Sequence, residues 1–219
     1  MRSKIPAVAA GLVLGGGIAM ADDFVLHEGP DLYAWREPGL ITGFGLGVEA
    51  GAGVTGFAGQ TMRDTVPGAI GGLWNFRVML GTHLPLALEL GYLGEASNIN
   101  VFGAPNGTLI GTTAEGDLRW NILPHLKFDP YIFAGVGYQR YDVQNAQLSQ
   151  ADTGMRPNDN SVEIPMGLGA SFRDPSGFIL DVRGTYRQEL DANLIQNPNG
   201  NGFANLSWWE ASASLGYEF

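Results

Sequence analysis

WWEASASLGYEF, at residues 208–219, alternates between two kinds of side chain at every step. One set is apolar and comprises Trp209, Ala211, Ala213, Leu215, Tyr217 and Phe219, and the intervening set is Glu210, Ser212, Ser214, Gly216 and Glu218. A period of two is typical of a β-strand, because successive side chains point to opposite faces. This strand therefore has one face suited to hydrocarbon and one face that is small, polar or charged.

The same alternation recurs upstream in the segments 43–57, 70–80, 86–94, 112–123, 130–141, 161–172 and 178–190. A strand that crosses a membrane at a tilt needs about 9–11 residues, which these segments provide. Segment 130–141 is less regular, because Tyr131 and Phe133 share a face with several glycines. An even strand count returns both ends of a barrel to one side of the membrane. The sequence predicts an all-β fold, an eight-stranded antiparallel transmembrane β-barrel with up-and-down meander topology, over residues 41–219.

The polar faces of these strands carry many ionisable side chains. We predict that they point into the lumen as a charge network of Glu49, Arg77, Glu115, Asp117, Arg119, Glu163, Asp181, Arg183 and Glu210. A soluble barrel would have to bury these groups in its core while exposing the apolar face, which is unfavourable for both sets. The bulky apolar face is therefore expected to contact lipid.

The connections between the predicted strands differ in length on the two sides of the barrel. Those at 81–85, 124–129 and 173–177 are short, whereas 58–69, 95–111, 142–160 and 191–203 are mostly longer and polar. Short periplasmic turns and longer surface loops are typical of outer-membrane barrels. The long connections are expected to be exposed at the cell surface.

The first residues have the features of a secretory signal peptide. Arg2 and Lys4 precede an apolar stretch at 5–17, and Ala19-Met20-Ala21 forms a small-x-small cleavage pattern. We predict a signal peptide at 1–21, cleaved after Ala21, and a periplasmic lead-in at 22–40. The formal net charge of −10 and the presence of only two lysines argue against a nucleic-acid partner.

These features resemble the small outer-membrane barrels of the OmpA-transmembrane and OmpX type. The resemblance covers residues 41–219 and rests on the strand pattern, on Phe133-Ala134-Gly135-Val136-Gly137-Tyr138 and on the final Leu215-Gly216-Tyr217-Glu218-Phe219. It implies location in the outer membrane of a Gram-negative bacterium, in contact with lipid and lipopolysaccharide, as a monomer. It also implies that Leu215, Tyr217 and Phe219 act as an assembly signal, read by the barrel assembly machinery.

Two motifs could indicate other chemistry. Residues 51–56 fit the dinucleotide pattern G-x-G-x-x-G, but a helix and a following acidic residue are missing from the context. His27, His83 and His125 could serve a lipid-modifying enzyme, yet none has a serine two or three positions away. We therefore expect no catalytic residues, no cofactor and no metal ligands.

The favoured function is a non-enzymatic barrel with a charge-filled lumen and surface loops, in a structural or binding role. A narrow porin-like channel for small or apolar solutes is the main alternative, because glycines on the inner face leave room. A lipid-modifying enzyme is the third possibility. Aromatic residues are expected at the membrane interfaces, namely Trp35, Trp74, Trp120, Trp208, Trp209, Tyr131, Tyr138, Tyr186 and Tyr217.

Overall fold

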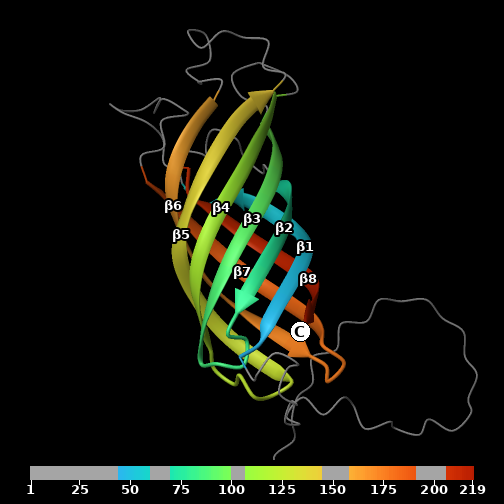
Figure 1. Cartoon of the computed structure of the whole chain (residues 1–219). Coiled ribbons are helices and arrows are strands. Elements are labelled where there is room, and N and C mark those ends of the chain that lie inside the picture. The colour runs from blue at the N-terminus through green and yellow to red at the C-terminus, as the bar shows by residue number, and fades with distance from the viewer. Residues whose placement is uncertain (1–43, 60–69, 100–106, 145–157, 191–205) are drawn as a thin grey trace, which may run out of the picture. The chain divides into compact units, whose positions relative to one another are not determined.

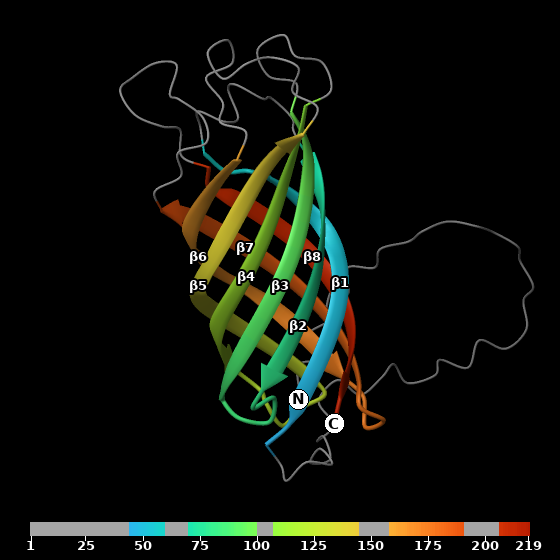
Figure 2. The same ribbon diagram turned by 45° about the horizontal axis from the view of Figure 1, so that its top comes forward.

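Eight strands form one closed barrel in the computed structural model, which describes residues 44–59, 70–99, 107–144, 158–190 and 206–219 (Figures 1 and 2). Neighbouring strands are consecutive and antiparallel, and β1 also pairs with β8. The predicted fold class and the up-and-down meander are therefore confirmed. The strands are β1 (Leu46–Phe57), β2 (Ile70–Leu80), β3 (Leu86–Ile99), β4 (Gly107–Asn121), β5 (Phe128–Gln144), β6 (Asn158–Arg173), β7 (Phe178–Leu190) and β8 (Trp208–Glu218).

The two faces of each strand meet different surroundings. In β8, Glu210, Ser214 and Glu218 are buried, whereas Trp209, Leu215 and Tyr217 are exposed. The other strands repeat this arrangement, so most of the large exposed side chains of the barrel wall are aliphatic or aromatic. The inner face instead holds ionisable and hydroxyl side chains. This distribution is the reverse of that in a soluble barrel.

Two aromatic side chains that we predicted at the membrane interface lie inside the barrel. Tyr131 and Trp208 are each only 1% exposed. Tyr131 shares the inner face with Phe133, opposite the exposed Ile132. The strand register decides the face, and neither side chain can turn outward without a one-residue shift of its whole strand. Trp74, Trp120, Trp209, Tyr138, Tyr186 and Tyr217 do point outward.

One half of the barrel wall is taller than the other, as Figure 1 shows for β3 to β5. β3 to β6 contain 14, 15, 17 and 16 residues, whereas β1, β2, β7 and β8 contain 12, 11, 13 and 11. The predicted loops at 95–111 and 142–160 were therefore too long. Toward the ends of these additional segments polar side chains appear on the outer face, as at Asn98 and Asn160. The strands stay paired beyond the apolar part of the wall. There the alternation of apolar and polar side chains, from which the strands were predicted, is lost.

The short connections have well-defined turns. Gly81 and Gly177 adopt φ values of 89° and 91°, which favour glycine. In the turn between β6 and β7, Gly177 N–H donates to the Asp174 carbonyl at 2.9 Å. The Ser176 hydroxyl and backbone N–H also donate to the Asp174 carboxylate, at 2.6 and 3.1 Å, and lower the pKa of this carboxyl group.

Pro165 interrupts the ladder between β5 and β6. The register joins Ala134 to Met166 and Gly137 to Glu163, but no pair is formed in between. Proline has no N–H to donate, which explains the gap. Pro165 still pairs with Arg187 of β7, so the barrel stays closed at this level.

The predicted signal peptide (1–21) and lead-in (22–40) lie outside the described residues. Among the residues that are described, no helix is long and apolar enough to span a membrane.

The orientation of the wall predicts how it responds to added charge. Leu90→Arg places a guanidinium on the outer face of β3, where Leu90 is 51% exposed. In lipid vesicles this substitution is expected to lower the free energy of unfolding by about 2–4 kcal/mol. Asn98→Arg, on the polar part of the same face, is expected to cost about 0–1 kcal/mol. Urea unfolding followed by tryptophan fluorescence measures both, and equal effects would contradict the assigned orientation.

Candidate functional site: the charged lumen

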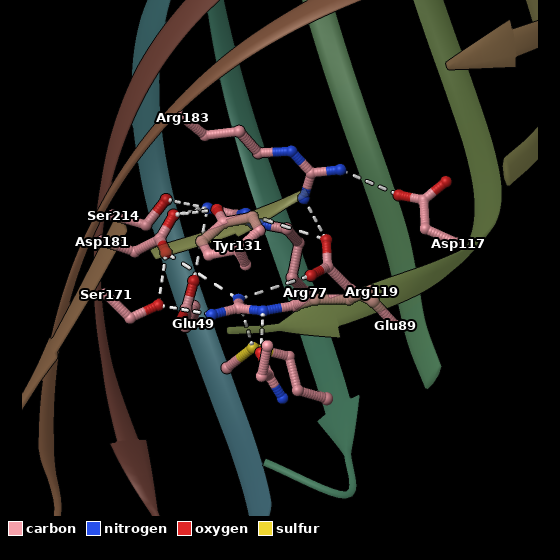
Figure 3. A network of polar contacts seen from close by, with 12 residues as sticks. Glu49, Arg77, Glu89, Asp117, Arg119, Tyr131, Ser171, Asp181, Arg183 and Ser214 are labelled. Carbon is pink, nitrogen blue, oxygen red and sulfur yellow. Dashed lines mark hydrogen bonds and ion pairs between the residues drawn. The ribbon is translucent and has the colours of Figure 1, made fainter. Parts of the chain in front are cut away.

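Arg77 of β2 is the centre of a buried ion-pair network, shown in Figure 3. Its Nη2 atom lies 3.2 Å from Glu49 Oε2 and 3.1 Å from Asp181 Oδ1. The same atom donates to the Ser214 hydroxyl at 2.7 Å, and Nη1 lies 3.7 Å from Glu89 Oε1. Arg77 therefore contacts groups from β1, β3, β7 and β8, on both sides of the lumen.

Arg119 of β4 extends this network toward the short turns. Its guanidinium donates to Ser171 at 2.6 Å and to Asn121 at 2.8 Å. It also lies 3.4 Å from the centroid of the Tyr131 ring, a cation–π contact that favours a desolvated guanidinium. The Tyr131 hydroxyl donates in turn to Asp181 Oδ1 at 3.0 Å. This aromatic ring is thus part of the polar network rather than a membrane anchor.

Two further arginines of β7 lie closer to the loop side. Arg183 pairs with Glu89 and, at 2.9 Å, with Asp117, and it stacks 3.4 Å above the Phe133 ring centroid. Arg187 binds Glu210 at 2.6 Å, Glu115 at 2.5 Å and Glu163. A cavity of about 10 Å³ between these layers, lined in part by Arg77, Arg183 and Arg187, has room for about one water molecule.

The structure places all nine residues of the predicted lumen network on the inner face, each at most 7% exposed. They fall into the connected groups around Arg77 and Arg119, around Arg183, and around Arg187. Sequence reasoning missed Glu89, which links Arg77 and Arg119 to Arg183, and Arg187, which is the centre of the remaining group. Both stand on the polar faces of predicted strands, so the alternation alone could have identified them.

Carboxyl groups outnumber arginines among the buried residues of the described barrel. The buried arginines are Arg77, Arg119, Arg173, Arg183 and Arg187. The buried acids are Glu49, Glu89, Glu95, Glu115, Asp117, Asp129, Glu163, Asp181, Glu189, Glu210 and Glu218. Arg77, Arg119, Arg183 and Arg187 each lie at most 3.8 Å from more than one carboxyl group, whereas Arg173 pairs with Asp129. The loss of Arg187 would remove the counter-charge of Glu115, Glu163 and Glu210 together.

The loop-side end of the lumen is filled by aromatic and aliphatic side chains. The Trp208 ring lies 4.1 Å from that of Phe57 and 6.1 Å from that of Tyr141, measured between centroids. The Trp208 Nε1–H donates to the Tyr141 hydroxyl at 2.5 Å. Leu109 and Leu206 are buried in the same barrel, at 1% and 0% exposure.

The turn-side end is closed by contacts between the first turn and the last strand. His83 Nε2 lies 2.8 Å from Glu218 Oε1, and the Thr82 hydroxyl donates to the same oxygen. These side chains surround Gly45, where an added Cβ would lie 2.0 Å from Thr82 Oγ1. We call Thr82, His83 and Glu218 the seam cluster. In it the His83 imidazole and the Thr82 hydroxyl both contact the Glu218 carboxylate.

The remaining sites considered in the sequence lie as follows. His125 is exposed in the second turn, and His27 lies outside the described residues. The glycine pattern at 51–56 is part of the uninterrupted strand β1, without the turn and helix that a dinucleotide site requires. In the described ranges no cluster of three or more His, Cys, Asp or Glu is arranged to hold a metal ion.

The residues of the predicted assembly signal lie on the outer face of the last strand. Leu215, Tyr217 and Phe219 are 55%, 43% and 40% exposed. The rings of Tyr217 and Phe219 meet edge to face, with centroids 5.2 Å apart. Because β8 pairs with both β1 and β7, this strand closes the barrel.

Comparisons with known proteins identify the fold. No protein-family model matches the sequence, and no curated protein matches it. Three solved structures are similar at a TM-score of 0.50, each over 80% of this chain. They are Neisserial surface protein A (15% identity, 97% of that chain), the attachment invasion locus protein Ail of Yersinia pestis (12%, 99%) and outer membrane protein OprG of Pseudomonas aeruginosa (12%, 96%). A weaker likeness, at a TM-score of 0.40, is to the outer membrane enzyme PagL.

At these identities the likeness concerns the fold, and a fold does not determine an activity. The chain has the fold of the small eight-stranded outer-membrane β-barrels, as its resemblance to the OmpA-transmembrane and OmpX type predicted.

The ion-pair network predicts a large stability effect at Arg77. Arg77→Met removes the ion-pair partner of the buried Glu49 and the nearest arginine of Asp181, which keeps Arg119 at 3.8 Å. Leaving the Glu49 carboxylate buried and unpaired is expected to cost about 3–5 kcal/mol. The matched control is Arg140→Met, because the Arg140–Asp142 pair has side chains that are 61% and 44% exposed and contributes at most about 1 kcal/mol. The temperature at which the folded band is lost in heat-modifiable gel migration, in detergent, compares the two. A shift no larger for Arg77→Met than for Arg140→Met would refute a paired network.

Proposed function

We propose that this chain is an integral outer-membrane protein without enzymatic activity, whose ion-paired lumen is a structural plug and whose surface-exposed end has an envelope or binding role. The observation that carries the proposal is the inverted distribution of side chains. Leu88, Leu90 and Leu118 face outward, whereas the buried positions beside them hold Glu89, Asp117 and Arg119. A hydrocarbon exterior suits such a wall, because in water the same side chains would form a large exposed apolar surface.

The filled lumen supports a plug rather than a channel. An eight-stranded barrel has an interior just wide enough for its own side chains. Here this space is occupied by the arginine layers, by the Trp208 cluster at the loop side and by the seam cluster at the turn side. The cavity between the arginine layers has room for about one water molecule and is bounded by charged groups that bind each other.

Conductance tests this proposal against the narrow-channel alternative. The purified full chain, reconstituted in planar bilayers, is expected to show no steady single-channel steps, because solute passage would require several buried ion pairs to separate. Vesicles from the same preparation establish by heat-modifiable migration that the barrel is folded and inserted. Reproducible single-channel conductance steps from inserted protein would show that the lumen is a pore rather than a plug.

The enzyme alternative has a separate test. His83 contacts Glu218 and Thr82 in the seam cluster, and His125 lies in the next turn, so the sites expected for a histidine base are on the turn side. We expect lipid A, incubated with the folded protein in the presence of phospholipid as an acyl donor, to keep its acyl composition, as measured by mass spectrometry. Loss or gain of an acyl chain, abolished by His83→Gln together with His125→Ala, would identify an enzyme instead.

A further inference from the structure

A groove of about 370 Å³ lies on the outer wall of the barrel, over β2, β3 and β4, which run side by side in Figure 1. Its volume is within the range of small-molecule binding sites. Gly72, Trp74, Gly94, Ala96, Ile110 and Thr112 line it from outward-facing positions, and Leu73, Glu95 and Gly111 line it from the positions between them. The plug and the seam cluster do not involve this surface.

Two rows of paired residues build the groove. The first row runs from Gly72 to Ala96 to Ile110, and the second from Trp74 to Gly94 to Thr112. The small residues of β2 and β3 leave the bottom of the groove unfilled. At Gly72, for example, an added Cβ would find no atom within 4 Å. The Trp74 indole forms one side, lying so close over Gly94 that an added Cβ there would be 2.4 Å from Nε1.

The outward-facing lining is mostly apolar and continues the lipid-facing wall. On the turn side, the next row contains Phe76 and Tyr92, and the Tyr92 ring lies 5.6 Å from that of Trp74. The acidic residue of the groove, Glu95, is 8% exposed and directs its carboxylate inward, where it accepts a hydrogen bond from Gln139 at 2.6 Å. The groove therefore offers a hydrocarbon chain contact without an opposing charge.

A basic side chain stands beside the groove. Thr112, at the end of the second row, pairs with Arg140 of β5, whose side chain is 61% exposed. Neighbouring strands are 4.7–4.9 Å apart, and Arg140 is two strands away from Gly94 in the same row. The backbone of Arg140 therefore lies roughly 10 Å from the groove floor at Gly94. Arg140 is the one basic residue on the outer face of the described strands. It contacts Asp142 through Nε, at 3.2 Å, which leaves the Nη groups to donate to a phosphate.

We propose that this surface is a specific lipid site, in which one acyl chain of lipid A, from lipopolysaccharide, occupies the groove while a lipid A phosphate binds Arg140. The inference rests on the proposed location in the outer membrane, with the β3–β4 and β5–β6 ends of the strands toward the cell surface. Lipid A fits for two reasons: it supplies both a phosphate and several acyl chains, and it belongs to the leaflet that this end of the barrel would contact. A zwitterionic phospholipid is expected to bind more weakly, because its phosphate is already paired within its own headgroup.

Native mass spectrometry of the folded full chain in detergent micelles, titrated with purified lipid A, tests the site. Gly72→Leu fills the groove from an open position and is expected to weaken lipid A binding about tenfold, as is Arg140→Gln, which removes a charged hydrogen-bond donor. Gly184→Leu is the matched control, because Gly184 is an outward glycine of β7 where an added Cβ also meets no atom within 4 Å. Binding by this variant is expected to equal that of the original chain.

Failure of the proposed lipid site can be distinguished from failure of the proposed function. If the chain fails to insert into lipid vesicles, the proposed function fails. If it inserts, but Gly72→Leu and Gly184→Leu bind lipid A equally, the groove is not a lipid site. Unchanged affinity in Arg140→Gln, or equal affinity of the original chain for dioleoylphosphatidylcholine, would overturn the assignment to lipid A.

Discussion

A polypeptide in hydrocarbon must satisfy every backbone N–H and C=O group internally, because the solvent offers no partner. In this chain the requirement is met by the pairing of β1 with β8, which runs from Gly47 and Glu218 to Phe57 and Trp208. Without this pairing, β1 and β8 would each present an open edge to lipid. Closure in turn creates an inside and an outside, and the period of two along every strand distributes the side chains between them.

The small diameter of the barrel constrains which side chains its interior can hold. Closure leaves no room for bulk water, so the ionisable groups on the inner face must bind one another. Arginine suits this task because its planar guanidinium can bind several carboxylates and also stack on an aromatic ring. Arg187 illustrates the first property with Glu115, Glu163 and Glu210, and Arg119 illustrates the second with Tyr131. The network, once formed, fixes the relative positions of strands that are not neighbours in the sheet.

Most of the fold could be predicted from the sequence, because the alternation of side chains follows directly from strand geometry. The inward placement of residues such as Arg77 and Glu163 followed from the same pattern. The strand ends at 95–99 and 142–144 could not be predicted in this way, because outward residues such as Asn98 and Gln144 are polar and resemble a loop. Trp208 was misplaced because aromatic residues are common both at membrane interfaces and in a packed end of a barrel, and composition does not separate the two.

Contacts between distant parts of the chain also escaped sequence reasoning. That Glu89 bridges Arg77 and Arg183 depends on the curvature of the closed sheet, which no local pattern contains. The external groove likewise depends on which residues of β2 and β3 are paired, with Gly72 opposite Ala96 and Trp74 opposite Gly94, and thus on the register. These features require the strands to be placed in three dimensions.

The seam cluster has a consequence for the order in which the molecule can be completed. Thr82 and His83 belong to the turn after β2, yet the oxygen that they share belongs to Glu218 in β8. A β1–β2 hairpin that has not yet met β8 therefore lacks these bonds. The contacts of the first turn with Glu218 are thus available only in the closed barrel, and a sheet that lacks β8 is not stabilised by them.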